Sequence, residues 1–267
     1  MKILRYVLCG LLIAAAIGLL CYQHFVEKDL DTSNIVKAIL IICGAVVTMV
    51  RPQKQRVVNK KALYAKAYSD FIQTAFYDEP KLEKRFYNAV HDYNKTKPAA
   101  GLAKLEKLRR ECQRSNDLWS VTVFTALCLD DMGLYEKAIA QYDGALSMRN
   151  SSSLLSNKGL CCQKLGRFEE AEQCYQHAVQ ADPKNAYAHN NLSALYFRLG
   201  DYGKALDAAE DAVGIDGTMR QALTTAAICC GILEYKEEYA QYYRKAVANG
   251  ADGNKIKHII QNLDPSL

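Results

Sequence analysis

The chain has 267 residues with only 5 prolines, half of its residues are hydrophobic, and it carries a formal net charge of +5. Residues 51–66 hold six basic and no acidic residues, whereas residues 67–267 carry a net charge of −2. Because the basic excess is confined to one short segment, the charge argues against nucleic acid as the main partner.

Two apolar segments near the N-terminus predict membrane-spanning helices. Residues 3–26 are apolar except near their ends, and at about 1.5 Å per residue a helix of this length crosses the ~30 Å hydrocarbon core. Residues 35–50 form a shorter second segment, with Lys37 near its start, where the side chain reaches the headgroups. We therefore expect a two-helix transmembrane hairpin with a short acidic outer loop over residues 1–52.

The placement of basic residues predicts the orientation of this hairpin. Lys2 and Arg5 precede the first span, six basic residues follow the second, and one lies in the loop. The positive-inside rule then places both termini in the cytoplasm of an integral membrane protein with two spans. The basic flanks favour a bacterial cell membrane. The alternative is that the first span is a cleaved signal peptide, but its apolar run is long for one.

A basic segment, from Arg51 to Lys66, follows the second span directly. Each basic residue near an anionic surface contributes about 1 kcal/mol of attraction, so membrane lipid is a predicted partner of this segment and of the spans. Apolar residues recur here with helical spacing, and residues 53–84 are predicted to form a linker helix region. A plain solvated linker is the alternative.

Internal repetition is the strongest pattern in the sequence. Residues 133–138 read Gly-Leu-Tyr-Glu-Lys-Ala, and Tyr142 and Ala145 follow. The pattern returns 33 residues later from Gly166 and 34 residues after that from Gly200. A weaker fourth copy has Lys236 and Tyr239 in the matching places. Small alanines would let the second helix of each unit lie close against the first.

These residues resemble the tetratricopeptide-repeat (TPR) family over about residues 119–253. The resemblance implies an all-α fold, a TPR-type right-handed solenoid of helix-turn-helix units. A degenerate first unit and a C-terminal capping helix, which would cover the last apolar face, complete the expected domain. The solenoid is expected over residues 85–253, with units at 85–118, 119–151, 152–185, 186–219 and 220–253, followed by the capping helix and tail at 254–267.

The resemblance to this family implies that a protein or peptide partner lies in a concave groove lined by the first helix of each unit. The expected groove mixes apolar and amide side chains, which suits an extended or helical peptide with apolar anchors. Asn157 and Asn191 occupy the same place in successive units, either as a ladder of amides for a peptide backbone or as two solvated side chains. The candidate partner-binding residues are Val123, Leu127, Ser156, Asn157, Leu160, Lys164, Tyr187, Asn190, Asn191, Phe197, Arg198 and Ile228.

No pattern in the sequence predicts catalytic, cofactor-binding or metal-binding residues. The ten cysteines include no CxxC pair, and they are expected to be reduced thiols packed as small apolar side chains. Cys174 and His177 are three residues apart, but two ligands do not make a zinc site. Phosphate-loop, nucleophile-elbow and zinc-protease motifs are missing as well. The chain is therefore expected not to be an enzyme.

Two functions remain open from the sequence. The first is a membrane-tethered interaction module, an adaptor or scaffold that binds a peptide or protein in the groove at the cytoplasmic face. The alternative is a structural subunit of a membrane, envelope-assembly or secretion complex, in which the outer face or the spans make the contacts.

Overall fold

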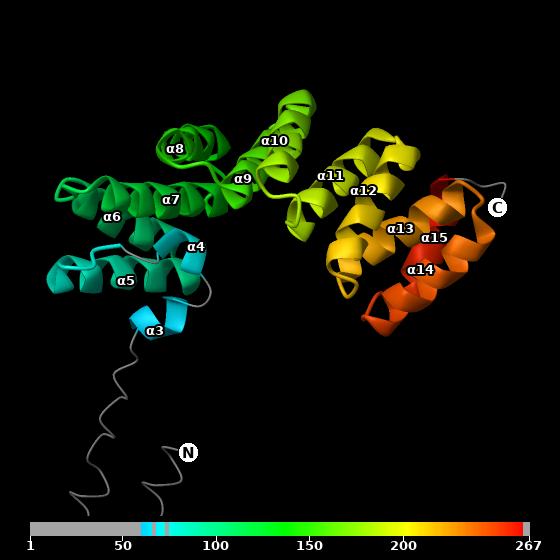
Figure 1. Ribbon diagram of the computed structural model, residues 1–267, viewed down its shortest axis with the longest axis horizontal. Helices are drawn as coiled ribbons and strands as arrows, with labels where there is room; N and C mark the ends of the chain where they lie inside the picture. Colours follow the sequence, from blue (N-terminus) through cyan, green and yellow to red (C-terminus); the bar gives the residue numbers. More distant parts are fainter. Residues whose placement is uncertain (1–59, 66–67, 73–74, 264–267) are drawn as a thin grey trace, which may run out of the picture. The chain divides into compact units, whose positions relative to one another are not determined.

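Every regular element in the described part of the chain is a helix (Figure 1). The computed structural model describes residues 60–65, 68–72 and 75–263. These helices belong to one compact unit, Asn59–Leu267, and the other unit, Met1–Val58, lies outside the described residues. In chain order the helices are α3 (Lys60–Ala65), α4 (Ser69–Ile72), α5 (Pro80–Asn94), α6 (Pro98–Arg109), α7 (Ser115–Asp131), α8 (Tyr135–Met148), α9 (Ser152–Lys164), α10 (Phe168–Ala181), α11 (Ala186–Leu199), α12 (Tyr202–Ile215), α13 (Arg220–Ile232), α14 (Lys236–Ala248) and α15 (Gly253–Leu263).

From α7 to α14 the helices pack in consecutive pairs, and each pair also contacts the next. The turn inside each of the first three pairs contains a glycine, Gly133, Gly166 or Gly200, with φ of 72°, 77° and 81°. Glycine adopts this left-handed conformation without the steric penalty that a Cβ brings. Glu234 stands at the same turn of the fourth pair, with φ of 60°. The prediction of an all-α fold built of repeated helix pairs is confirmed.

Small residues allow the two helices of a pair to approach closely. Ala138, Ala171 and Ala205 are all fully buried on the second helices. On α9, a Cβ added to Gly159 would lie 2.6 Å from Cε1 of Tyr175, whose ring packs on the glycine from α10. Because interiors are close-packed, the ring occupies the space that any larger residue would need.

A cluster rich in aromatic side chains holds the beginning of the described chain. It joins residues of α3, α4, α5, α6 and α7, with Phe76, Phe86 and Phe124 fully buried in it. The Phe86 and Phe124 rings meet edge to face with centroids 5.5 Å apart, a favourable geometry for aromatic pairs. Asp117 of α7 fixes the chain here, because its buried carboxylate accepts a 2.6 Å hydrogen bond from the backbone N–H of Phe76.

Helix α15 covers the last pair at the C-terminal end. Ile256 and Ile260 are buried against Leu223, Ile228 and Ala246 of α13 and α14. Most of the other residues of α15 are exposed. The helix therefore buries an apolar surface that a further pair would otherwise cover.

The predicted integral-membrane localisation is wrong by this structure. Among residues 60–65, 68–72 and 75–263, the structure has no helix that is both long and apolar enough to cross a membrane. The longest described helix, α7, has 17 residues, fewer than the ~20 that a span needs, and it carries three aspartates. The segments 3–26 and 35–50, to which the spans of the hairpin were assigned, lie outside the described residues.

Candidate functional site

The predicted groove residues lie on the first helices of the pairs, at positions that recur every 33 or 34 residues. Residues at one such position can therefore be compared between α7, α9, α11 and α13. The structure does not present these four helices equally. It fully or almost fully buries Val123 on α7 and Ile228 on α13, and it leaves most of the predicted residues on α9 and α11 at least partly accessible.

On α7, the chain's own segment 68–72 packs over the expected groove register. The Ser120 hydroxyl donates to the carbonyl oxygen of Phe71 at 3.0 Å. The Tyr68 ring meets Phe124 edge to face at 5.2 Å, and the Phe71 ring lies 6.1 Å from Trp119.

The two predicted partner-binding residues on α7 are wholly or partly buried. Val123 is fully buried, and Leu127 is half-buried among the same side chains as Tyr68 and Phe71. Val123 is part of the core and offers no open surface to a partner, and Leu127 packs against the same cluster.

On α9, three of the four predicted residues are at least partly exposed, and the fourth, Ser156, is buried. Ser156 is 4% exposed, and its Oγ makes no hydrogen bond within the described part of the chain. Asn157 is half-buried, Leu160 is 37% exposed and Lys164 is exposed. An unsatisfied buried hydroxyl costs about 1–3 kcal/mol.

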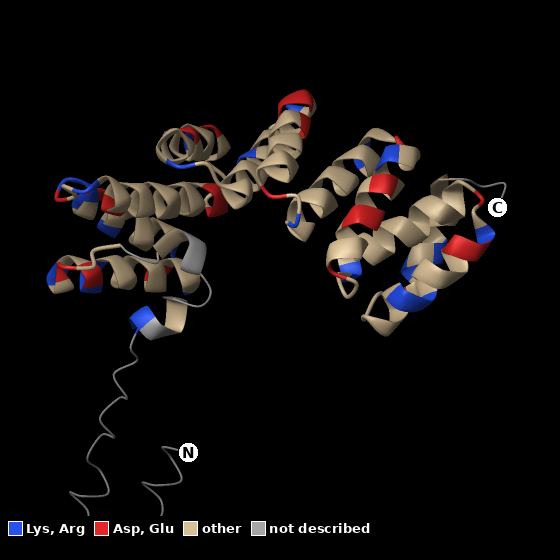
Figure 2. Ribbon diagram, viewed as in Figure 1, with Lys and Arg blue, Asp and Glu red and all other residues tan. Residues whose placement is uncertain are grey.

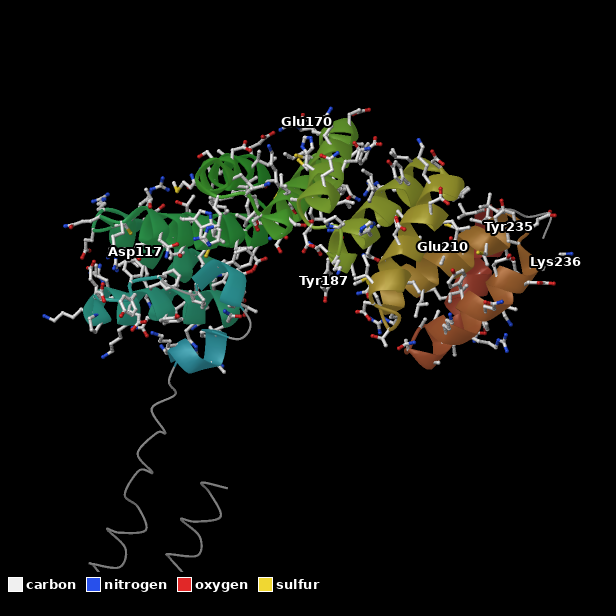
Figure 3. The ribbon with its side chains drawn as sticks, in the orientation of Figure 1. Asp117, Glu170, Tyr187, Glu210, Tyr235 and Lys236 are labelled. Atoms are coloured by element: carbon white, nitrogen blue, oxygen red, sulfur yellow. The ribbon has the colours of Figure 1, made fainter. Side chains whose placement is uncertain are left out.

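On α11, the corresponding residues continue this surface. Tyr187 is 70% exposed and projects from the beginning of the helix (Figure 3). Asn190 and Asn191 are half-buried. Phe197 is half-buried against Tyr202, with ring centroids 5.6 Å apart. Arg198 is exposed, and its guanidinium lies 5.2 Å from the centre of the Phe168 ring.

Three half-buried amides, those of Asn157, Asn190 and Asn191, have open hydrogen-bonding capacity. Among residues 75–263 their side chains neither donate nor accept a hydrogen bond. Asn185 differs, since its side chain accepts from the backbone N–H groups of Tyr187 and Ala188 and donates to the Ser152 hydroxyl at 2.7 Å. We call the surface formed by Asn157, Leu160, Tyr187, Asn190 and Asn191 the amide face.

On α13 the last predicted residue, Ile228, is 4% exposed and packs in the cluster that α15 closes. The amide face therefore contains residues of α9 and α11, two helices that contact each other. The sequence pattern did not distinguish these accessible positions from the enclosed ones on α7 and α13. The aromatic residues before α5 were the available signal that another segment packs on α7.

The thiols of the described residues show no reactive environment. All seven cysteines there are free, and six of them are buried. Burial raises the pKa of Cys229 to about 12 and the pKa of Cys230 to about 11, so both thiols are protonated at neutral pH. Nucleophilic and metal-ligating cysteines act as thiolates, which these surroundings disfavour. Within the described residues, no group of three or more histidine, cysteine, aspartate or glutamate side chains is placed to hold a metal ion.

A carboxylate lies near the edge of the amide face. Asp130, on α7, accepts a hydrogen bond of 3.4 Å from the Tyr142 hydroxyl. Burial raises the pKa of the Asp130 carboxyl, and the nearby Lys164 cation acts in the opposite direction. Lys164 and Arg198 lie on α9 and α11, the helices that carry the amide face, and Asp130 of α7 is near Lys164.

Comparison with protein families places repeats of known type on this part of the chain. Residues 150–216 match a tetratricopeptide-repeat family model. A TPR repeat-containing thioredoxin of Arabidopsis thaliana is 40% identical over 70 residues, which cover 26% of this chain and 10% of the relative. A TPR repeat-containing protein of Methanocaldococcus jannaschii is 35% identical over 71 residues, which cover 27% of this chain and 12% of the relative. The matches thus span only about a tenth of the length of these curated relatives.

Solved structures show the same fold at low sequence identity. MamA superimposes with a TM-score of 0.53 at 17% identity, covering 60% of this chain and 93% of MamA. YrrB superimposes with a TM-score of 0.52 at 15% identity, covering 75% of this chain and 97% of YrrB. The predicted solenoid of tetratricopeptide-repeat type is supported by these likenesses.

Proposed function

We propose that this chain, whose residues 150–216 match the tetratricopeptide-repeat family, is a protein-binding module that holds an extended peptide across its amide face. Proteins of this repeat type are generally protein–protein interaction modules. The observation that carries the proposal is the set of three half-buried amides, Asn157, Asn190 and Asn191, that make no hydrogen bond among the described residues.

The chemistry of the amide face fits a peptide backbone. An asparagine side chain both donates and accepts, so it pairs with the N–H and C=O of an extended chain. Asn157 and Asn191 hold the same position on the first helices of successive pairs, so a bound peptide could pair with two amides. Leu160 and Tyr187 offer apolar surface beside them for side-chain anchors. YrrB, which shares the fold, is a TPR protein with an unusual peptide-binding site.

The distribution of charge also favours a protein partner over nucleic acid. Acidic and basic residues are interspersed on the described helices (Figure 2). A nucleic-acid partner selects for a continuous basic patch or stripe. The proposal involves no catalytic step, in keeping with the protonated, buried thiols of Cys229 and Cys230.

The test is a selection for binders from a library of random peptides displayed on phage, followed by titration of the selected peptides. Loss of one net hydrogen bond costs about 1 kcal/mol, so the double variant Asn157→Ala/Asn191→Ala should weaken binding roughly tenfold or more. Asn249→Ala/Asn262→Ala removes two amides outside the amide face, one just after α14 and one on α15, and serves as the matched control.

Two outcomes contradict the proposal: selection of no peptide, or selected peptides that bind the double variant as tightly as the wild type. The alternative of a structural subunit would use the outer helices of the pairs. In that case the amide-face variant would leave assembly with the partner unchanged.

A further inference from the structure

A second candidate site lies at the C-terminal end, away from the amide face. A cavity of about 270 Å³ opens between the ends of α13, α14 and α15. Its lining includes Gly231 and Glu234 from the end of α13 and the turn after it, Lys236 from α14, and Lys257 and Ile260 from α15. Lys236 stands at the beginning of α14 (Figure 3). We call this cavity the terminal slot.

One position beside the terminal slot departs from the repeat. Lys236 occupies the position that holds Tyr135, Phe168 and Tyr202 in the three preceding pairs. Each of those aromatic rings is half-buried against a hydrophobic cluster. At the fourth pair no ring is supplied by the chain at this position, because a lysine replaces it. The terminal slot lies beside this position, and Tyr239, three residues further along α14, forms part of its lining.

The inner surface of the slot is apolar and closely packed. Ile260 is buried on α15, and Gly231 approaches it so closely that an added Cβ would collide with its side chain. Cys230 lies beside them, also buried. Such a surface favours an aromatic or aliphatic group over a polar one.

The rim of the slot carries charge that is not neutralised within it. Lys236 and Lys257 are exposed, and in the described part of the chain neither forms an ion pair. Lys257 instead lies over the Tyr243 ring, 5.5 Å from its centre. Glu234 is the one acidic residue of the lining, so two cations face one anion. The rim is complementary to a group that carries negative charge next to an apolar body.

We infer that the terminal slot binds an aromatic side chain of a partner peptide that has an acidic residue beside it. The ring replaces the aromatic that the fourth pair lacks, and the carboxylate pairs with Lys236 and Lys257. The site uses no residue of the amide face. The inference therefore goes beyond the proposed function, and its success or failure is independent of Asn157 and Asn191.

The test titrates the full chain into a short fluorinated peptide, acetyl-Gly-Asp-(4-fluoro-Phe)-Gly-amide, and follows the fluorine NMR signal. Saturable binding is expected, and a peptide with Lys in place of Asp should bind at least tenfold more weakly. The variant Lys236→Phe supplies the missing ring from within the chain and should abolish binding. Lys107→Phe changes an exposed lysine of α6 and should bind like the wild type.

Folding and location are checked separately. Circular dichroism and thermal unfolding of Lys236→Phe should show full helix content and a melting temperature at or above that of the wild type, since the ring fills a cavity. Asn157→Ala/Asn191→Ala should bind the probe as well as the wild type does. Equal binding of the Asp and Lys peptides, undiminished binding by a folded Lys236→Phe, or loss of binding in the amide-face variant would each overturn the inference.

Discussion

Glu234 gives the sharpest test of how the repeats shape this fold. It is a residue with a Cβ at φ of 60°, at the turn where the other three pairs have glycine with φ between 72° and 81°. A left-handed backbone costs an ordinary L-residue about 1–2 kcal/mol, and glycine escapes this cost. Glycine also has a more flexible unfolded state, which removes roughly 0.5–1 kcal/mol of the gain. Glu234→Gly should therefore stabilise the protein by about 0.5–1 kcal/mol.

Thermal unfolding followed by circular dichroism measures this effect. For a domain of this size, 1 kcal/mol moves the melting temperature by about 2–4 °C, so the expected rise is roughly 1–4 °C. Glu234→Ala is the matched control, because it removes the same carboxylate but keeps a Cβ in the left-handed conformation. If alanine raised the melting temperature as much as glycine did, charge would be the cause and the reasoning from backbone strain would be refuted.

Three further substitutions test the packing. Gly159→Ala should destabilise the protein by about 1–3 kcal/mol in denaturant unfolding, because the new methyl group meets the Tyr175 ring; an unchanged midpoint would show that the ring moves aside freely. Phe71→Ala should shift the fluorescence of Trp119, the chain's only tryptophan, to longer wavelength as water reaches it, and an unchanged spectrum would mean that the segment before α5 does not cover α7. Asp117→Ala should lower the free energy of unfolding by about 2 kcal/mol or more, since it leaves the buried backbone N–H of Phe76 without its acceptor. If Asp117→Leu were as stable as the wild type, this explanation would be wrong.

The sequence predicts the helix pairs well because the rule behind them is local. The turn of a pair favours glycine because its φ is positive, as at Gly166, and the second helix favours a small alanine where it packs on the first, as at Ala171. These residues therefore recur at a fixed spacing, which can be seen in a single sequence. The all-α solenoid could therefore be predicted without coordinates.

The accessible part of the candidate site could not be predicted in the same way. Val123 and Asn190 hold one register position, yet Val123 is fully buried in a cluster against which Phe71, about fifty residues earlier in the chain, packs, whereas Asn190 is only half-buried. Ile228 is covered by α15, which follows all the pairs. These contacts join parts of the chain that the repeat does not relate, so the periodic pattern carries no information about them.

The terminal slot could not be predicted from the sequence for a related reason. In the sequence, Lys236 is a weak match to the repeat and suggests only a degenerate copy. In the structure, the same departure places a lysine, instead of a ring, in the lining of a cavity. A mismatch in a pattern has structural meaning only when the surroundings of the missing side chain are known.

If the amide face binds a peptide as proposed, the packing of residues 68–72 on α7 limits the length of that peptide. Because Ser120 is already bonded to Phe71, a bound peptide ends at α9 on that side. Neighbouring helices lie about 8–10 Å apart, so the distance from α9 past α11 to α13 is roughly 20 Å. An extended chain advances about 3.3 Å per residue, which makes the bound segment about six residues long. On this proposal the fold has one closed end, and the recognition sequence of a partner should be short.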